Sequence, residues 1–205
     1  MRPVNIMNDA LTSILGQFIN LVEKSDVVNT MERLEGNQRD WHTSLEYLET
    51  LYKQPHDGYP ESAYSYCLKP QHHKSLDSCY KKEYNILDWK IRSELGIQHC
   101  ALSQMYPEGG YIGWHSNEET PAHNLIFTWS ETGDGYFEWV DPITKEHTRM
   151  QDTQGWQCKA GYFGEDKHDR IFHHASTNCK RVTLSYTLGF DEEFWEDCID
   201  HIERG

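Results

Sequence analysis

The sequence has few basic residues and no long apolar run. Its 205 residues include 19 Lys and Arg against 33 Asp and Glu, so the formal net charge is −14 with the 12 histidines neutral. Proteins that coat nucleic acid gain affinity by neutralising phosphates, and polybasic anchors bind anionic lipids, so this balance disfavours both roles. No stretch of about 18 apolar residues is present, and we therefore expect no membrane-spanning helix. Nucleic acid and membrane are not expected partners.

The cysteines form no C-x-x-C pair, which argues against a zinc ribbon and a thioredoxin-like redox motif. The six are Cys67, Cys79, Cys100, Cys158, Cys179 and Cys198. The opening residues MRPVNIMNDA contain no apolar segment of the length of a secretion signal, so we expect a cytoplasmic protein with reduced thiols. The chain is 13% aromatic and 25% charged, a composition typical of a globular domain.

The first half of the chain is predicted to be mostly helical. Over 8–24, apolar residues recur at i, i+3, i+4, i+7, i+8 and i+11, as in an amphipathic helix. That stripe consists of Leu11, Ile14, Leu15, Phe18, Ile19 and Val22. A mostly helical pattern continues over 26–53, where one buried face is expected to carry Trp41, Leu45, Leu48 and Leu51. Pro, Gly and Tyr residues predict a loop over 54–70, and a further helix is expected over 81–95.

After Gly96 the pattern changes to short apolar and aromatic runs separated by turn residues. Strands are predicted near 99–106, 111–115, 123–129, 135–140, 146–150, 160–164, 169–174 and 181–188. Such strands favour a sandwich or barrel over alternating helices and strands. We expect one structural domain with a helical support region and loop over 1–95, a β core over 96–190 and an acidic C-terminal helix over 191–205.

Two histidine-containing segments lie in the strand-rich half. His115 ends the run YIGWH before the polar turn SNEE, whereas His173 and His174 lie in RIFHHAST, shortly before Arg181. On an extended strand, a histidine and a polar residue two positions away point to the same side and can face one metal ion. Two histidines and one oxygen ligand, with positions left open, are the facial arrangement of non-haem Fe(II) oxygenases. A lone histidine is more often structural, but the combination of these segments indicates a metal site.

The segment QMYPEGGYIGWHSNE at 104–118 resembles the core motif of the 2-oxoglutarate- and Fe(II)-dependent dioxygenases, of AlkB-like or prolyl-hydroxylase-like type. The glycine turn and the nine-residue step from Tyr106 to His115 are similar to the AlkB-type pattern. Downstream, His174 with the alanine after it resembles the family's second metal histidine, and RVT at 181–183 resembles its Arg-x-Ser signature. The resemblance covers about residues 96–189.

This resemblance implies a mainly β fold with flanking helices, namely a double-stranded β-helix (the cupin-like jelly roll) braced by N-terminal α-helices. It also implies that His115 and His174 bind Fe(II). Arg181 would pair with the distal carboxylate of 2-oxoglutarate, because a planar guanidinium matches a carboxylate through two parallel hydrogen bonds. Tyr106 and Thr183 would add hydroxyl hydrogen bonds to the same cosubstrate.

Two points of the implied metal site stay open. Asn117 stands where the family has Asp or Glu, and a neutral amide oxygen is a weaker ligand for Fe(II) than a carboxylate. Either Asn117 binds through its carbonyl oxygen, or Glu118 or Glu119 supplies the ligand, or the site is degraded. The small residue after His174 favours it over His173, but neighbours on a strand face opposite ways and a bulge reverses the assignment.

The implied activity is an O2-dependent hydroxylation, with ascorbate as a supporting reductant and with release of succinate and CO2. The substrate is expected to be a peptidyl C–H bond, for example prolyl, or a small-molecule one. An AlkB-like nucleobase oxidase is the alternative within the family, but the acidic charge disfavours it, as does Thr187 in place of a second arginine six residues after Arg181. A non-catalytic jelly-roll binding module with a degraded metal site is the alternative outside enzymes. The sequence leaves the substrate and the oligomeric state open.

Overall fold

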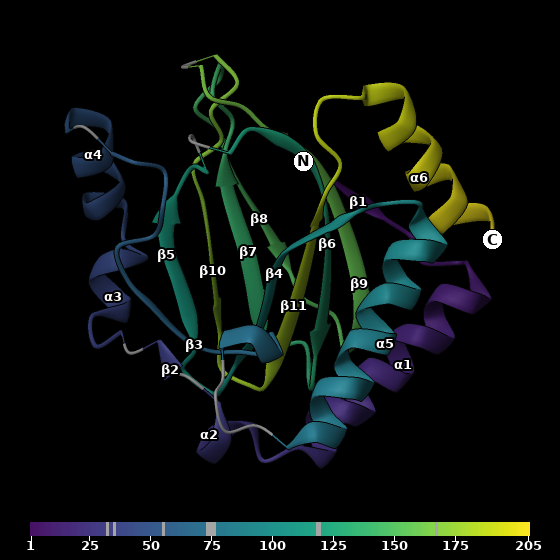
Figure 1. The fold of residues 1–205 in the computed structure, drawn as a ribbon. Coiled ribbons are helices and arrows are strands. Elements are labelled where there is room, and N and C mark those ends of the chain that lie inside the picture. The colour runs from purple at the N-terminus through teal and green to yellow at the C-terminus, as the bar shows by residue number, and fades with distance from the viewer. Residues whose placement is uncertain (32, 35, 55, 73–76, 118–119, 167) are drawn as a thin grey trace.

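Short strands dominate the second half of the chain in the computed structural model, which describes all residues except 32, 35, 55, 73–76, 118–119 and 167 (Figure 1). The strands are β1 (Arg2–Val4), β2 (Arg33–Leu34), β3 (Ala63–Cys67), β4 (His99–Tyr106), β5 (Tyr111–His115), β6 (Ala122–Ser130), β7 (Gly135–Val140), β8 (His147–Gln151), β9 (Gly155–Phe163), β10 (His173–Thr177) and β11 (Arg181–Thr187). The helices are α1 (Asp9–Lys24), α2 (Val27–Thr30), α3 (Arg39–His42), α4 (Leu45–Lys53), α5 (Ser78–Leu95) and α6 (Glu192–Arg204), with a 3₁₀ turn at Pro70–His72.

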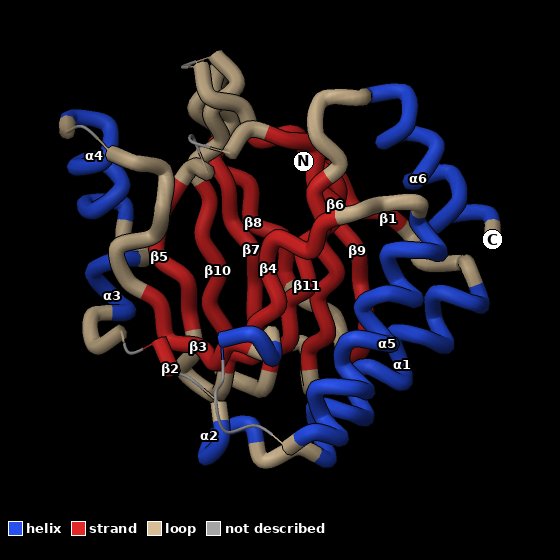
Figure 2. The backbone as a smooth tube through the Cα atoms, viewed as in Figure 1, coloured by secondary structure: helices blue, strands red, loops and turns tan. Residues whose placement is uncertain are grey.

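The strands form one curled antiparallel sheet. Within the described residues the order is β1-β9-β6-β11-β4-β3-β5-β10-β7-β8, and β2 pairs with β3. The sheet has two halves, because β9, β6, β11 and β4 lie together in one and β5, β10, β7 and β8 in the other, with β3 between them (Figure 2). Successive strands thus interleave around a shared interior, which is the topology of a jelly roll. The predicted double-stranded β-helix with flanking helices is confirmed.

Three helices cover the outside of one half of the sheet. Figure 1 shows α1, α5 and α6 along the side of β1 and β9, whereas α3 and α4 lie beside β5. The predicted stripe of α1 is buried apart from the half-buried Ile14, and Phe18 contacts Tyr84 of α5 edge-to-face at 5.5 Å between ring centroids. Asn8 caps α1, because its side chain accepts a hydrogen bond from the backbone N–H of Leu11. The helical layer therefore fixes the half of the sheet that contains β11.

The N-terminal region differs from the sequence-based expectation. Residues 26–53 form three short helices and β2 instead of one continuing pattern, and the predicted buried face is wrong for two of its members. Leu48 and Leu51 are buried, but Trp41 is 45% and Leu45 55% exposed. Ser44 starts α4 by capping it, so Leu45 falls in its exposed first turn. The predicted loop over 54–70 contains β3, whose pairing with β4 and β5 is long-range.

The predicted strands agree with β4 to β8 and with β11 to within one residue at each end, β9 begins at Gly155 instead of 160, and the seventh strand is displaced. We expected it over 169–174, but β10 begins at His173 and runs to Thr177. None of the six cysteines, all of which lie among the described residues, forms a disulfide. Among the described helices, none combines the length and the apolar character that crossing a bilayer requires.

Candidate functional site

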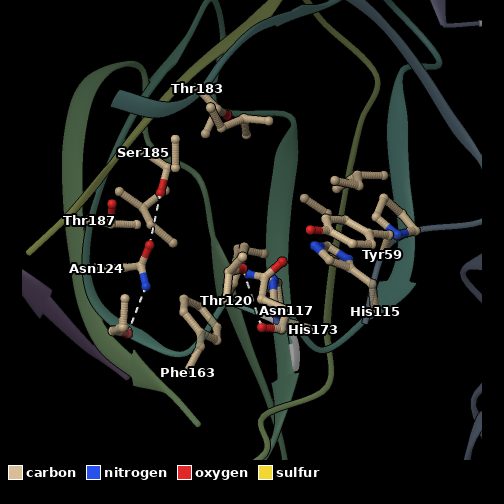
Figure 3. A pocket seen from close by; sticks show the side chains of 18 of the residues that line it. Tyr59, His115, Asn117, Thr120, Asn124, Phe163, His173, Thr183, Ser185 and Thr187 are labelled. Carbon is tan, nitrogen blue, oxygen red and sulfur yellow. Dashed lines mark hydrogen bonds between the residues drawn. The ribbon is translucent and has the colours of Figure 1, made fainter. Parts of the chain in front are cut away.

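A cavity of about 580 Å³ lies between the two halves of the sheet (Figure 3). Alternate side chains of β6, β10 and β11 point into it, as the two-residue period of a strand requires, and β4 and β5 contribute further lining residues. Its volume is in the range of small-molecule binding sites. Arg181 is the one permanently charged side chain among the described residues that line it.

Two buried histidines face each other in this cavity. His115 ends β5 and His173 begins β10, where the strands pair in register, and their ring centroids are 4.1 Å apart. His115 Nδ1 donates to the Gly113 carbonyl at 2.8 Å, and His173 Nδ1 donates to the Ile171 carbonyl at 3.0 Å. A carbonyl oxygen only accepts, so each ring carries its proton on Nδ1 and has an accepting lone pair at Nε2. Backbone carbonyls orient metal-binding histidines in this way.

Burial also keeps both imidazoles neutral. It lowers the pKa of His115 to about 4, and it lowers the pKa of His173 well below the usual 6.5, with the neighbouring His115 adding to the effect. Near neutral pH the two Nε2 atoms are therefore unprotonated and can offer their electron pairs, as coordination of a cation requires.

Asn117 is the third polar group at the histidine pair. Its backbone φ of 57° is left-handed, a conformation that Asn tolerates, and its N–H donates to the Gly58 carbonyl at 2.8 Å. Its amide Nδ2 lies 3.5 Å from His173 Nε2, and half a turn about Cβ–Cγ would present the carbonyl oxygen instead. The alternatives Glu118 and Glu119 lie outside the described residues. Among the described residues, here or elsewhere, no three His, Cys, Asp or Glu side chains gather as a metal site.

His174 lies on the other face of β10, so His173, and not the expected His174, faces the cavity. Its ring packs against Trp114 at 4.1 Å between centroids, and its Nε2 is 3.8 Å from Glu138 Oε2, on the outside of the sheet. Although burial acts to raise it, hydrogen bonds from His174 and Arg149 lower the pKa of Glu138 to about 2. Because β10 begins at His173 and shifts register against β5 just after it, the inward position falls one residue earlier than expected.

The predicted cosubstrate residues lie together at the side of the cavity formed by β4 and β11. Arg181 is 2% exposed; its Nη1 donates to Thr183 Oγ1 at 2.8 Å and its Nη2 to Thr128 Oγ1 at 3.4 Å. Arg181 and Tyr106 are register partners, with the guanidinium carbon 5.7 Å from the centre of the phenol ring. Burial raises the pKa of Tyr106 to about 12, although Arg181 opposes the rise, so the phenol stays protonated and can donate.

Sequence reasoning missed two charged residues behind Arg181. Asp152 Oδ2 accepts from Arg181 Nε at 2.8 Å, and Lys159 Nζ lies 3.5 Å from Asp152 Oδ1. Both side chains are almost completely buried. Lys159 had a signal in the sequence, since it stands in the otherwise uncharged strand QCKAGYF, whereas Asp152 lies just before a strand and had none.

The wall of the cavity opposite His115 carries polar but uncharged side chains. Ser185 Oγ donates to Asn124 Oδ1 at 3.3 Å, and Thr187 and Phe163 lie beside them. In Figure 3 this group lies on one side of the cavity and His115 on the other. The cavity thus combines a pair of neutral nitrogen donors, a buried guanidinium and an uncharged wall.

The comparisons with known proteins give a fold and no sequence relative. No family model and no curated protein matches the sequence. A prolyl hydroxylase from Trichoplax adhaerens, in complex with an oxygen degradation domain peptide fragment of hypoxia inducible factor, has a TM-score of 0.50 at 11% identity, covering 95% of this chain and 85% of that one.

Two further solved structures are similar at lower scores. A prolyl-4-hydroxylase from Pseudomonas putida has a TM-score of 0.44 at 9% identity, with 91% of this chain and 89% of that one covered. A dioxygenase for auxin oxidation from Arabidopsis thaliana, in complex with 2-oxoglutarate, has a TM-score of 0.32 at 12% identity, with 90% and 80% covered. At such identities the likeness to the first structure shows the fold alone, a jelly roll that also occurs in a prolyl hydroxylase.

Proposed function

We propose that this protein is a 2-oxoglutarate- and Fe(II)-dependent dioxygenase that hydroxylates a C–H bond of a peptide. A small molecule is the alternative substrate class. The observation that carries the proposal is the convergence of His115, His173 and Arg181 in one cavity of a jelly roll. A peptide is favoured because the first structural neighbour is described with a peptide fragment. The uncharged wall of the cavity suits a neutral side chain, a prolyl ring for example.

The donor set fits a divalent metal ion. The His115 and His173 rings are neutral, buried and 4.1 Å apart between centroids, and the Asn117 carbonyl oxygen would be the third donor after rotation of the amide. Two nitrogen donors and one oxygen donor from the protein would leave coordination positions open, as in the facial sites of non-haem Fe(II) oxygenases. The neutral third donor predicts weaker metal binding than a carboxylate would give.

The surroundings of Arg181 fit the distal carboxylate of 2-oxoglutarate. Nε is held by Asp152 and each Nη donates one N–H to a threonine, so the second N–H of each Nη remains for a carboxylate, while Thr183 and Tyr106 offer hydroxyl groups nearby. When bound, Fe(II) and 2-oxoglutarate supply the oxidising chemistry: O2 is consumed, the keto acid becomes succinate and CO2, and a substrate C–H bond becomes C–OH. Ascorbate is proposed to keep the metal reduced.

The chain's own residues would hold the metal ion and the cosubstrate in place and keep water away from them. Gly113 and Ile171 hold the two imidazoles in one tautomer, and the buried site keeps bulk water from the reacting atoms. Arg181 fixes one end of the cosubstrate and therefore directs its other end toward the histidines.

The test is succinate formation from 2-oxoglutarate by purified protein with Fe(II), ascorbate and O2, with proline-containing peptides added. Strand neighbours on opposite faces give a matched pair of variants. We expect His173→Ala to abolish succinate formation and His174→Ala to retain a large part of it, once both are shown to be folded. Equal succinate release from wild type and His173→Ala would refute the proposal.

The second candidate is a binding module that keeps the cavity without the reaction. Asn117 in place of a carboxylate is the observation that favours it. A protein of this kind would give no succinate above the His173→Ala background with any peptide, yet would still bind a ligand in the cavity.

A further inference from the structure

Arg181 and the two charged residues behind it, Asp152 and Lys159, together carry more positive than negative charge. Leaving histidines aside, the buried charged side chains among the described residues are Glu138, Asp152, Lys159 and Arg181. Glu138 lies on the outer face, paired with Arg149. The interior therefore holds two cations and one carboxylate, a net charge of +1 with little access to solvent. Such an excess is costly in a low-dielectric interior unless an anion joins it.

Asp152 is held in place by several groups. Its Oδ1 accepts from Gln157 Nε2 at 2.7 Å, and its backbone N–H donates to the Gly135 carbonyl at 2.8 Å. A Cβ atom at Gly135 would lie only 2.7 Å from Asp152 Oδ2, so the missing side chain leaves room for the carboxylate. The carboxylate takes the Nε side of Arg181 and therefore turns the Nη edge to Thr183 and the cavity.

Lys159 completes the group from β9. Its side chain is fully buried, its register partner Ile126 lines the cavity, and its ammonium faces the Asp152 carboxylate. Burial and the nearby Arg181 lower the pKa of Lys159 to about 8 in spite of Asp152, as expected where negative charge is in short supply.

We propose that Asp152 and Lys159 are positioning residues for the anion site of Arg181: Asp152 orients the guanidinium, and Lys159 offsets the charge of Asp152 so that the site stays net positive and accepts a carboxylate. The inference rests on the proposed function, since it assigns the distal carboxylate of 2-oxoglutarate as that anion. Without Lys159, Asp152 would neutralise Arg181, and the attraction for the carboxylate would decrease.

The experiment measures calorimetric dissociation constants for 2-oxoglutarate and for pyruvate, with Mn(II) present and O2 excluded. Pyruvate has the keto acid but no distal carboxylate. We expect Lys159→Met to weaken 2-oxoglutarate binding by about tenfold or more, Asp152→Asn, which keeps an oxygen acceptor for Arg181 Nε, to tighten it, and the double variant to return close to wild type. Pyruvate affinity is expected to stay the same in all four proteins.

Opposite effects of the two neutralising substitutions on 2-oxoglutarate affinity distinguish an effect of charge from disrupted packing, because misfolding would weaken the binding of every ligand. Thermal unfolding of each variant checks that it is folded, and Lys159→Gln replaces Lys159→Met if the latter is not. Unchanged 2-oxoglutarate affinity in the folded Lys159 variant, with normal binding by wild type, would overturn this inference alone. Parallel losses for 2-oxoglutarate and pyruvate would also overturn it. Failure of wild type to bind 2-oxoglutarate would overturn the proposed function and this inference together.

Discussion

Asn117→Asp is expected to tighten the binding of a divalent metal ion strongly. The substitution replaces one amide by a carboxylate of the same shape, and Asp tolerates the left-handed backbone of this position as Asn does. The amide lies 3.5 Å from His173 Nε2, so the new charge would be adjacent to any ion held by the two histidines. The added attraction is therefore direct and not a long-range field effect.

The size of the effect follows from Coulomb's law. Two unit charges about 4 Å apart attract by about 4 kcal/mol at an effective dielectric constant of about 20. Desolvation of the new carboxylate removes part of this gain, so we expect a metal affinity about a hundredfold higher than that of wild type. Mn(II) titration near neutral pH, followed by calorimetry or by the loss of the free-ion EPR signal, measures it.

Asn124→Asp is the matched control. It adds the same charge to the same cavity, on the wall opposite His115 (Figure 3), so we expect it to change Mn(II) affinity by less than about tenfold. Asn117→Ala is expected to weaken binding, because it removes the oxygen donor. If Asn117→Asp binds Mn(II) no better than wild type, or only as well as Asn124→Asp, Asn117 does not reach the metal and the assignment is refuted.

Three further predictions concern stability. Burial lowers the pKa of His115 to about 4 from an unfolded value near 6.5, so the unfolded state binds more protons between these two pH values. The free energy of unfolding of the metal-free protein should therefore decrease by about 3 kcal/mol as the pH falls through this range, and His173 should add to the loss. A free energy of unfolding, measured by urea denaturation, that stays constant from pH 7 to pH 4 would contradict this. Phe18→Ala removes a fully buried ring that contacts Tyr84 and should cost about 3–5 kcal/mol by urea denaturation, and a cost below about 1 kcal/mol would mean that the helical layer is not packed as described. Asn8→Ala should cost about 1 kcal/mol through loss of the cap of α1, whereas Asn8→Ser should retain most of the stability, and equal losses in the two variants would argue against capping.

Patterns in the local sequence predicted those helices and strands whose formation depends on neighbouring residues in the chain. The stripe of α1 follows from helical periodicity, and β4, β5 and β11 follow from apolar runs between turns, so Tyr106, His115 and Arg181 were found in their correct elements. The two halves of the site meet because β10 pairs with β5, and no local pattern contains that pairing.

The inward position of His173 and the contact of Asp152 with Arg181 escaped sequence reasoning for the same reason. Alternation predicts which neighbour faces inward only when the start of the strand is known, and the apolar residues Ile171 and Phe172 suggested a start before His173. The contact of Asp152 with Arg181 spans 29 positions and depends on the pairing of β9 and β11 with β6. Register between distant strands is a tertiary property, so single-sequence reasoning found several side chains that line the cavity but not the buried charged residues behind Arg181.

The most direct measurement is a crystal structure of the protein with Mn(II) and a non-reactive 2-oxoglutarate analogue. Our account predicts one metal ion bound by His115 Nε2, His173 Nε2 and the Asn117 carbonyl oxygen, with the distal carboxylate of the analogue against the Nη atoms of Arg181. A metal ion bound at His174, or an analogue bound away from Arg181, would contradict it.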